Sequence, residues 1–168
     1  PRDPLAQSFT IQNTQGAFLT SIDVYFNTAP AAGTADANIP VRMELRPLRN
    51  GVPSQTEIVP GSEVIVSAAT IRSNIPSNLD DLATIQATPT KFTFDAPVFI
   101  PGNTPHAFIL MADTVDYNVY VAETEKFEVG STARKVAKQP TLGSLFLSQN
   151  GSTWTPAQNK DMKFELMS

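Results

Sequence analysis

The sequence lacks cysteine altogether, and its 168 residues include a single histidine, His106. Without thiols there can be no disulfide scaffold, no thiolate metal site and no cysteine nucleophile. A hydrolytic triad needs a base beside its nucleophile. His106 lies at the start of an apolar run, where a histidine is more often a hydrogen-bonded residue at a strand edge than a catalytic base. The G-x-S-x-G, P-loop and G-x-G-x-x-G motifs are missing as well. We therefore expect a protein that is not an enzyme and that uses no cofactor and no metal.

Charge is also scarce in this chain. Charged residues make up 17% of the sequence and the net charge is −4, whereas about 25% charged residues is usual for a soluble domain. The basic residues are scattered apart from Arg134, Lys135 and Lys138, a cluster typical of a solvated loop. No basic patch is available to neutralise phosphates, so we expect no nucleic-acid partner. No signal peptide opens the chain and no apolar run approaches the roughly 18 residues of a membrane-spanning helix, so we expect no membrane insertion.

Short segments with alternating apolar and polar residues recur along the chain, separated by fourteen prolines and eight glycines. Such alternation predicts β-strands. We expect an all-β fold, an antiparallel two-sheet β-sandwich of jelly-roll type with about eight to ten strands and no long helix. Residues 1–168 are expected to form one such domain, and the opening Pro1 in place of Met suggests a piece of a longer chain. The predicted strands are 5–11, 18–26, 41–46, 63–67, 91–100, 107–111, 117–122, 145–147 and 162–166.

Several predicted strands come with an expected orientation. Alternation over 18–26 places Phe18, Ile22, Val24 and Phe26 in the core, and Leu19, Asp23 and Tyr25 on the opposite face. Over 41–46, Val41, Met43 and Leu45 are expected inside and the intervening charged residues outside. In the last strand, Phe164 and Leu166 are expected to face the core.

Turns and long connections complete the predicted fold. Asn50 and Gly51 predict a tight turn, and Pro97 predicts a bulge or a sheet edge, because proline cannot donate to a strand ladder. Three long connections are expected at 27–40, 68–90 and 123–143, and residues 78–82 of the second suggest a helical turn. Connections of this length are often functional.

The acidic residues leave one enzymatic alternative open. Paired carboxylates serve glycoside hydrolysis, and the candidates lie at predicted strand ends and in loops, where acidic residues commonly cap turns. A glycan depolymerase is therefore the least favoured hypothesis, and no D-x-D-x-D-G spacing supports a calcium loop. The candidate carboxylates are Asp80, Asp81, Asp113, Asp116, Glu123, Glu125 and Glu128.

The segment 143–156 is the most informative part of the sequence for binding. It contains the only tryptophan, Trp154, just after the predicted turn at Asn150 and Gly151. Either Trp154 folds back and caps the core, which we favour, or it is exposed and stacks on a sugar or a partner protein. In the second case Gln149 and Asn150 would offer amides to sugar hydroxyls, and Tyr120 is a further candidate surface residue, with Tyr25 and Tyr117 as other aromatic platforms.

The chain contains seven segments whose residue patterns are informative together: Asp3–Phe9, Gly16–Phe26, Pro40–Arg46, Asn50–Pro53, Phe92–Val98, Gly143–Trp154 and Asp161–Phe164. Together these segments resemble domains of tail, baseplate and fibre structural proteins of large T4-like phages, including phages of cyanobacteria. The similar segments span both ends of the chain and most predicted strands, although residues 68–90 look longer than the family usually has. A looser similarity extends to carbohydrate-binding-like jelly-roll modules of bacterial surface proteins.

The resemblance implies a structural module of the virion with no catalytic residues. Its expected partners are other virion proteins, within an oligomeric particle that is assembled in the host cytoplasm and then lies outside the cell. The alternative is a module that binds a carbohydrate or host receptor, with a host surface glycan as the partner. No binding residue is transferred from the family by position, so Trp154, Gln149, Asn150 and Tyr120 stay candidates from the residues alone.

Overall fold

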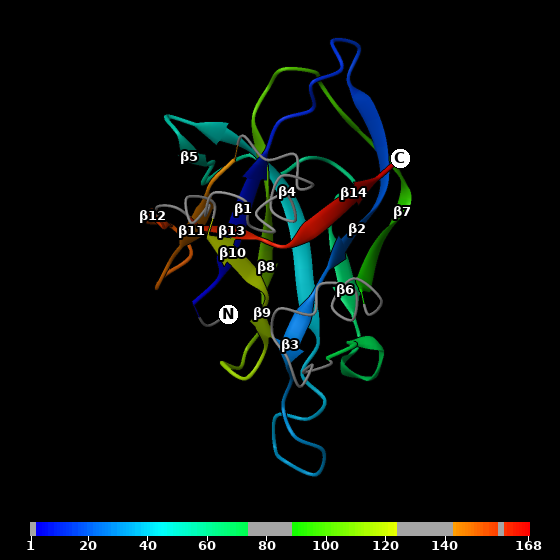
Figure 1. Cartoon of the computed structure of the whole chain (residues 1–168), viewed down its shortest axis with the longest axis vertical. Coiled ribbons are helices and arrows are strands. Elements are labelled where there is room, and N and C mark those ends of the chain that lie inside the picture. Colours follow the sequence, from blue (N-terminus) through cyan, green and yellow to red (C-terminus); the bar gives the residue numbers. More distant parts are fainter. Residues whose placement is uncertain (1–2, 74–88, 124–142, 158–159) are drawn as a thin grey trace, which may run out of the picture.

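The computed structural model describes residues 3–73, 89–123, 143–157 and 160–168, and this part of the chain is almost entirely β (Figure 1). Every strand pair among these residues is antiparallel, and the strands form two main sheets with further short two-stranded pairs. Its one helical element is a 3-10 turn, η1, at Ala68–Thr70. The predicted all-β, antiparallel, sandwich-like fold is confirmed, while the jelly-roll connectivity stays a prediction.

The large sheet has seven strands in the order β12-β11-β1-β8-β4-β5, with β6 paired to the other end of β4. β8 lies centrally between β1 and β4, and five of its six residues are buried, as expected for the apolar run that starts near His106. A strand buried on both faces needs apolar residues at successive positions, which this run supplies. The strands are β1 (Leu5–Phe9), β4 (Val41–Arg49), β5 (Val52–Pro53), β6 (Val64–Val66), β8 (His106–Met111), β11 (Leu145–Leu147) and β12 (Thr155–Ala157).

The small sheet has three strands in the order β14-β2-β7 and faces part of the large sheet. Its strands are β2 (Ala17–Val24), β7 (Thr90–Ile100) and β14 (Phe164–Met167). Two short pairs continue the fold, β3 (Phe26–Thr28) with β9 (Asn118–Val119) and β10 (Val121–Glu123) with β13 (Lys160–Met162).

The main core lies between the sheets and is built from the inward residues of both. Phe108 of β8 meets Phe164 of β14 edge to face, with ring centroids 5.2 Å apart. A polar link crosses the same interior, because the fully buried Gln7 donates from Nε2 to the Asp161 carboxylate at 3.1 Å and accepts the Met162 N–H at 2.7 Å. Buried polar groups are stable in a core when they are paired in this way.

Two expectations about the strand faces are wrong. Glu44, expected outside, is buried, because the outer face of the large sheet is itself covered and Arg46 pairs with Glu44 there at 2.8 Å. Phe18 was expected in the core, but its side chain is 60% exposed, and Leu19 is buried in its place. The cause is an irregularity in the β2–β7 pairing: the register passes from Leu19↔Val98 directly to Ser21↔Thr93. Such a bulge shifts the alternation, so residues on its two sides no longer share a face. Tyr25, expected on the outer side, is also buried.

Other predictions about strands are confirmed with modified boundaries. The segments 18–26, 117–122 and 162–166 each divide into two strands, and β5 and β12 lie where no strand was predicted, so the described residues contain more strands than expected. Asn50 and Gly51 have φ values of 56° and 81° in the predicted turn. Pro97 lies on the edge strand β7 within the bulge itself, where residues 94–97 of β7 stand opposite Thr20 of β2. Most of the connections 68–90 and 123–143, including the predicted turn at 78–82, lies outside the described residues, whereas connection 27–40 contains no strand beyond Thr28.

Candidate functional site

Trp154 lies on the outer face of the large sheet, where it is only 7% exposed. It forms a second apolar cluster with Ala6, Ala107, Ile109 and Phe146, whose side chains point away from the main core. The indole Nε1 is buried and makes no hydrogen bond within the described part of the chain. The ring is therefore a packing group that covers the second face of the sheet, and not an exposed stacking platform.

The turn before Trp154 is held by its own side chains. Ser148 Oγ accepts the N–H groups of Asn150 and Gly151, and Asn150 Oδ1 accepts those of Ser152 and Thr153, at 2.8–3.3 Å. Gly151 adopts φ of 76°, a left-handed conformation that glycine reaches without strain. Gln149 and Asn150 are both exposed, but the amide oxygen of Asn150 is occupied by the turn.

A shallow groove of about 680 Å³ lies on the other side of this turn, at the edge of the large sheet. Leu5, Leu147 and Pro4 provide its apolar lining, and polar residues, including the exposed Asp3 and Gln149, provide the rest. Asp3 is the only charged residue among the lining residues. The groove brings together two predicted site residues, Gln149 and Asn150, but not Trp154. Its lining residues are Asp3, Pro4, Leu5, Leu147, Ser148, Gln149, Asn150, Thr153 and Thr155.

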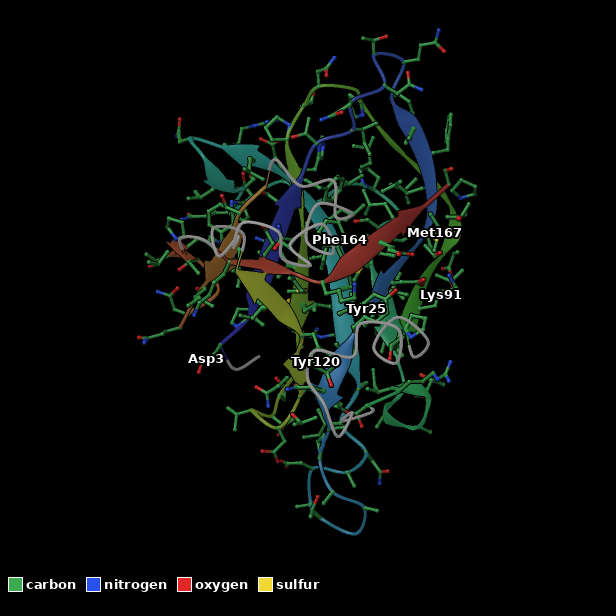
Figure 2. The ribbon with its side chains drawn as sticks, in the orientation of Figure 1. Asp3, Tyr25, Lys91, Tyr120, Phe164 and Met167 are labelled. Atoms are coloured by element: carbon green, nitrogen blue, oxygen red, sulfur yellow. The ribbon has the colours of Figure 1, made fainter. Side chains whose placement is uncertain are left out.

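Tyr120 belongs to a different part of the molecule. Its N–H donates to the Tyr25 carbonyl at 2.8 Å and its carbonyl accepts the Lys163 N–H at 2.9 Å. Figure 2 shows Tyr120 beside Tyr25, and Tyr120 is not among the residues that line the groove. Tyr120 is half-buried, and burial raises its pKa. The four predicted site residues therefore do not form one site.

The neighbours of Tyr120 belong to a partly buried polar cluster beside the small sheet. The Lys163 ammonium lies 5.0 Å from the centre of the Tyr25 ring. Tyr25 is 2% exposed, and burial, with smaller contributions from Glu165 and Asp23, raises its pKa to about 12. Lys91 closes the cluster with an ion pair of 2.9 Å to Asp23. Lys163 thus contacts the Tyr25 ring and Lys91 pairs with Asp23. We therefore interpret the cluster as a structural contact.

The candidate catalytic residues are dispersed. His106 is buried, its Nδ1 lies 2.9 Å from the Thr104 carbonyl and its ring stacks on Phe9. Burial lowers the pKa of His106. Asp113 and Asp116 are exposed, and Asp80, Asp81, Glu125 and Glu128 lie outside the described residues, as does the side-chain environment of Glu123. Across the ranges that the structure describes, no three His, Asp or Glu side chains gather in a way that could hold a metal.

Sequence reasoning missed the most unusual surface feature, an exposed pair of aromatic rings. Phe18 of β2 and Phe99 of β7 are direct partners in the ladder, 60% and 46% exposed, with ring centroids 5.1 Å apart and planes inclined by 53°. A Cβ on Gly16 would lie 2.8 Å from the Phe99 ring, so Phe99 packs closely over this glycine. The signal was present in Pro97, which predicts the bulge, but the sequence does not show which strand face the bulge turns outward.

Comparisons with known proteins return no match: no family model, no curated protein and no solved structure is similar to this chain. Within the described residues, no helix has the length and apolar content needed to cross a membrane.

Proposed function

We propose that this chain is a structural module of a phage tail, baseplate or tail fibre that joins neighbouring virion proteins. The resemblance of Asp3–Phe9, Gly16–Phe26 and Gly143–Trp154 to such domains suggests the role. The observation that supports it most is the exposed pair Phe18 and Phe99. Aromatic residues are enriched at protein interfaces, and exposed apolar patches commonly mark interaction sites.

The proposed role is mechanical and not enzymatic. The sheets share a large apolar core that is crossed by the Gln7–Asp161 link, and the outer face of the large sheet has a second cluster under Trp154. Apolar side chains thus cover both faces of the large sheet. Such packing suits a virion component that must keep its shape outside the cell. Virion location, assembly in the host cytoplasm and an oligomeric setting belong to the same proposal.

A cryo-electron microscopy map of the particle that contains this chain tests the proposal. We expect Phe18 and Phe99 to be covered by protein. A map in which this domain is surrounded by solvent on all sides would contradict the assembly role.

A second candidate function, binding of a host glycan, is favoured by the groove beside Gln149. Its size lies within the range of small-molecule sites, and its apolar lining with a few polar groups is typical of them. A glycan array with wild type, Gln149→Ala and the distant control Gln12→Ala tests this role. Binding that only Gln149→Ala weakens would support it, whereas no binding, or equal binding by all three proteins, would reject it at this groove.

A further inference from the structure

Asparagine followed directly by glycine occurs twice in the chain, at Asn50–Gly51 and at Asn150–Gly151. In such a pair the glycine nitrogen can attack the asparagine side-chain carbonyl carbon, Cγ, because glycine has no Cβ to hinder the approach. The new C–N bond closes a five-membered succinimide ring, and the side-chain amide leaves with the glycine N–H proton as ammonia. Water then opens the ring at either carbonyl and gives aspartate or isoaspartate. Because the dipeptide is the same at both places, the folded surroundings decide how each pair reacts.

Asn50 and Gly51 form the two-residue loop between β4 and β5. The residues on either side of the loop, Arg49 and Val52, are direct partners in the ladder. Both loop residues are exposed and have positive φ, 56° and 81°. Positive φ at both central positions is the pattern of a type I′ hairpin turn. The peptide group that joins Asn50 to Gly51 therefore lies at the tip of the hairpin.

This tip peptide is free to rotate. Among the described residues, the Asn50 side chain, the Asn50 carbonyl and the Gly51 N–H have no hydrogen-bond partner. A Cβ on Gly51 would have no neighbour within 4 Å, so the space around it is open. The other common hairpin turn, type II′, joins the same strands and differs from type I′ by a rotation of this peptide plane. That rotation brings the Gly51 nitrogen towards Asn50 Cγ without opening a strand pair.

The second pair, Asn150 and Gly151, is held in place by its neighbours. Ser148 Oγ accepts the Gly151 N–H at 2.8 Å, so the nitrogen that would attack is already bound. Asn150 Oδ1 accepts the N–H groups of Ser152 and Thr153 at 2.9 and 2.8 Å, which directs the side chain towards the residues that follow and away from the Gly151 nitrogen. These three hydrogen bonds must open before the ring can close. At the typical net strength of such bonds, this requirement slows the reaction by about a hundredfold.

We infer that Asn50 is a site of spontaneous succinimide-mediated modification in the folded protein, whereas Asn150 is protected. The inference does not depend on the proposed assembly function. Each product has a carboxylate in place of the Asn50 amide, so the reaction adds one negative charge to the exposed turn. Isoaspartate also places an extra carbon in the main chain of a two-residue loop. Leu48 and Val52 beside this loop pack against the Trp154 cluster, so the modification lies at the border of the second apolar cluster.

Incubation of the folded protein at mildly alkaline pH, followed by peptide mapping with mass spectrometry, tests the inference. The change from amide to acid raises the mass of a modified peptide, and chromatography separates its aspartate and isoaspartate forms. We expect the Asn50 peptide to convert about a hundredfold faster than the Asn150 peptide. The same chain unfolded in guanidinium chloride is the control. There the hydrogen bonds around Asn150 are lost, so the two rates should become similar.

Two variants give independent readouts. Ser148→Ala removes the acceptor of the Gly151 N–H and leaves the β4–β5 loop untouched. It should speed the modification of Asn150 about fivefold, the effect of losing one hydrogen bond of typical strength, and should leave the rate at Asn50 unchanged. Asn50→Gln lengthens the side chain, so that ring closure would need a slower six-membered ring. The acidic form that wild type accumulates in isoelectric focusing should therefore not appear in this variant, and circular dichroism checks that both variants are folded.

Three results would overturn the inference. The first is a rate at Asn50 in the folded protein that is no greater than the rate at Asn150. The second is a difference between the two rates that persists in guanidinium chloride, because it would then arise from neighbouring residue types and not from the fold. The third is a rate at Asn150 that Ser148→Ala leaves unchanged.

Discussion

Replacing Trp154 with alanine tests the second apolar cluster directly. The side chain is 7% exposed and contacts Ala6, Ile109 and Phe146. Removing a buried aromatic side chain typically costs about 3–5 kcal/mol of unfolding free energy. The alanine variant also removes an unpaired buried N–H, a group that costs about 1–3 kcal/mol. We therefore expect Trp154→Ala to lose about 3 kcal/mol, at the lower end of the usual range.

Trp154→Phe separates the two contributions. It keeps most of the apolar contact and removes the unpaired N–H, so we expect its unfolding free energy to stay within about 1 kcal/mol of wild type. Urea unfolding followed by circular dichroism measures all variants on one scale. Ile65→Ala is the control, because an exposed side chain on the other end of the sheet should change stability by no more than about 0.5 kcal/mol.

The wild-type protein provides a second readout, since Trp154 is its only tryptophan. Its fluorescence should have the short emission wavelength of a buried indole in the native state and shift to longer wavelength on unfolding. Native emission like that of indole in water would refute the burial. A Trp154→Ala variant as stable as wild type would refute the second cluster, and an equal loss in Trp154→Phe would refute the argument from the unpaired N–H.

Three further predictions concern the core, the bulge and the buried tyrosine. Phe164→Ala should lose about 3–5 kcal/mol in urea unfolding, and unchanged unfolding would show that β14 does not contribute to the core. Gly16→Ala should lower the free energy of unfolding clearly more than Gly51→Ala does. Both glycines have a positive φ near +80°, but a Cβ on Gly16 would lie 2.5–2.8 Å from its neighbours, whereas one on Gly51 would have no neighbour within 4 Å. Equal losses of stability would contradict the close packing around Gly16. Tyr25 should ionise near pH 12 in an absorbance titration, later than an ordinary tyrosine near 10. Its folded-state pKa is raised, so stability should fall as pH rises from about 10 to about 12, by about 2–3 kcal/mol, and Tyr25→Phe should remove that loss.

The strand pattern was predictable because alternation reports local geometry. Val41, Met43 and Leu45 are buried, as period 2 requires. Glu44 was expected outside, yet it is buried, because the outer face of the large sheet is itself covered and Arg46 pairs with Glu44 at 2.8 Å. Alternation identifies two faces of a strand, but it does not tell how much each face is covered.

The candidate site was predictable only in part, because its residues are distant in sequence. The favoured expectation for Trp154, that it folds back as a packing residue, agrees with its burial, although the ring covers the outer face of a sheet and not the end of the sandwich. Gln149 lies in the groove, but that groove also needs Asp3 and Leu5 from the other end of the chain. The pair Phe18 and Phe99 was missed, since the bulge that contains Pro97 changes which side chains face outward.

The sequence by itself determined the class of the fold, the strand segments and the lack of thiol chemistry, because these depend on residue type and on spacing along a few neighbouring residues. Only the tertiary structure decided that Trp154 is buried, that Tyr120 lies apart from Gln149 and that Phe18 and Phe99 are exposed together. Those outcomes depend on register and on sheet packing, which join residues far apart in the chain through contacts that no local pattern encodes.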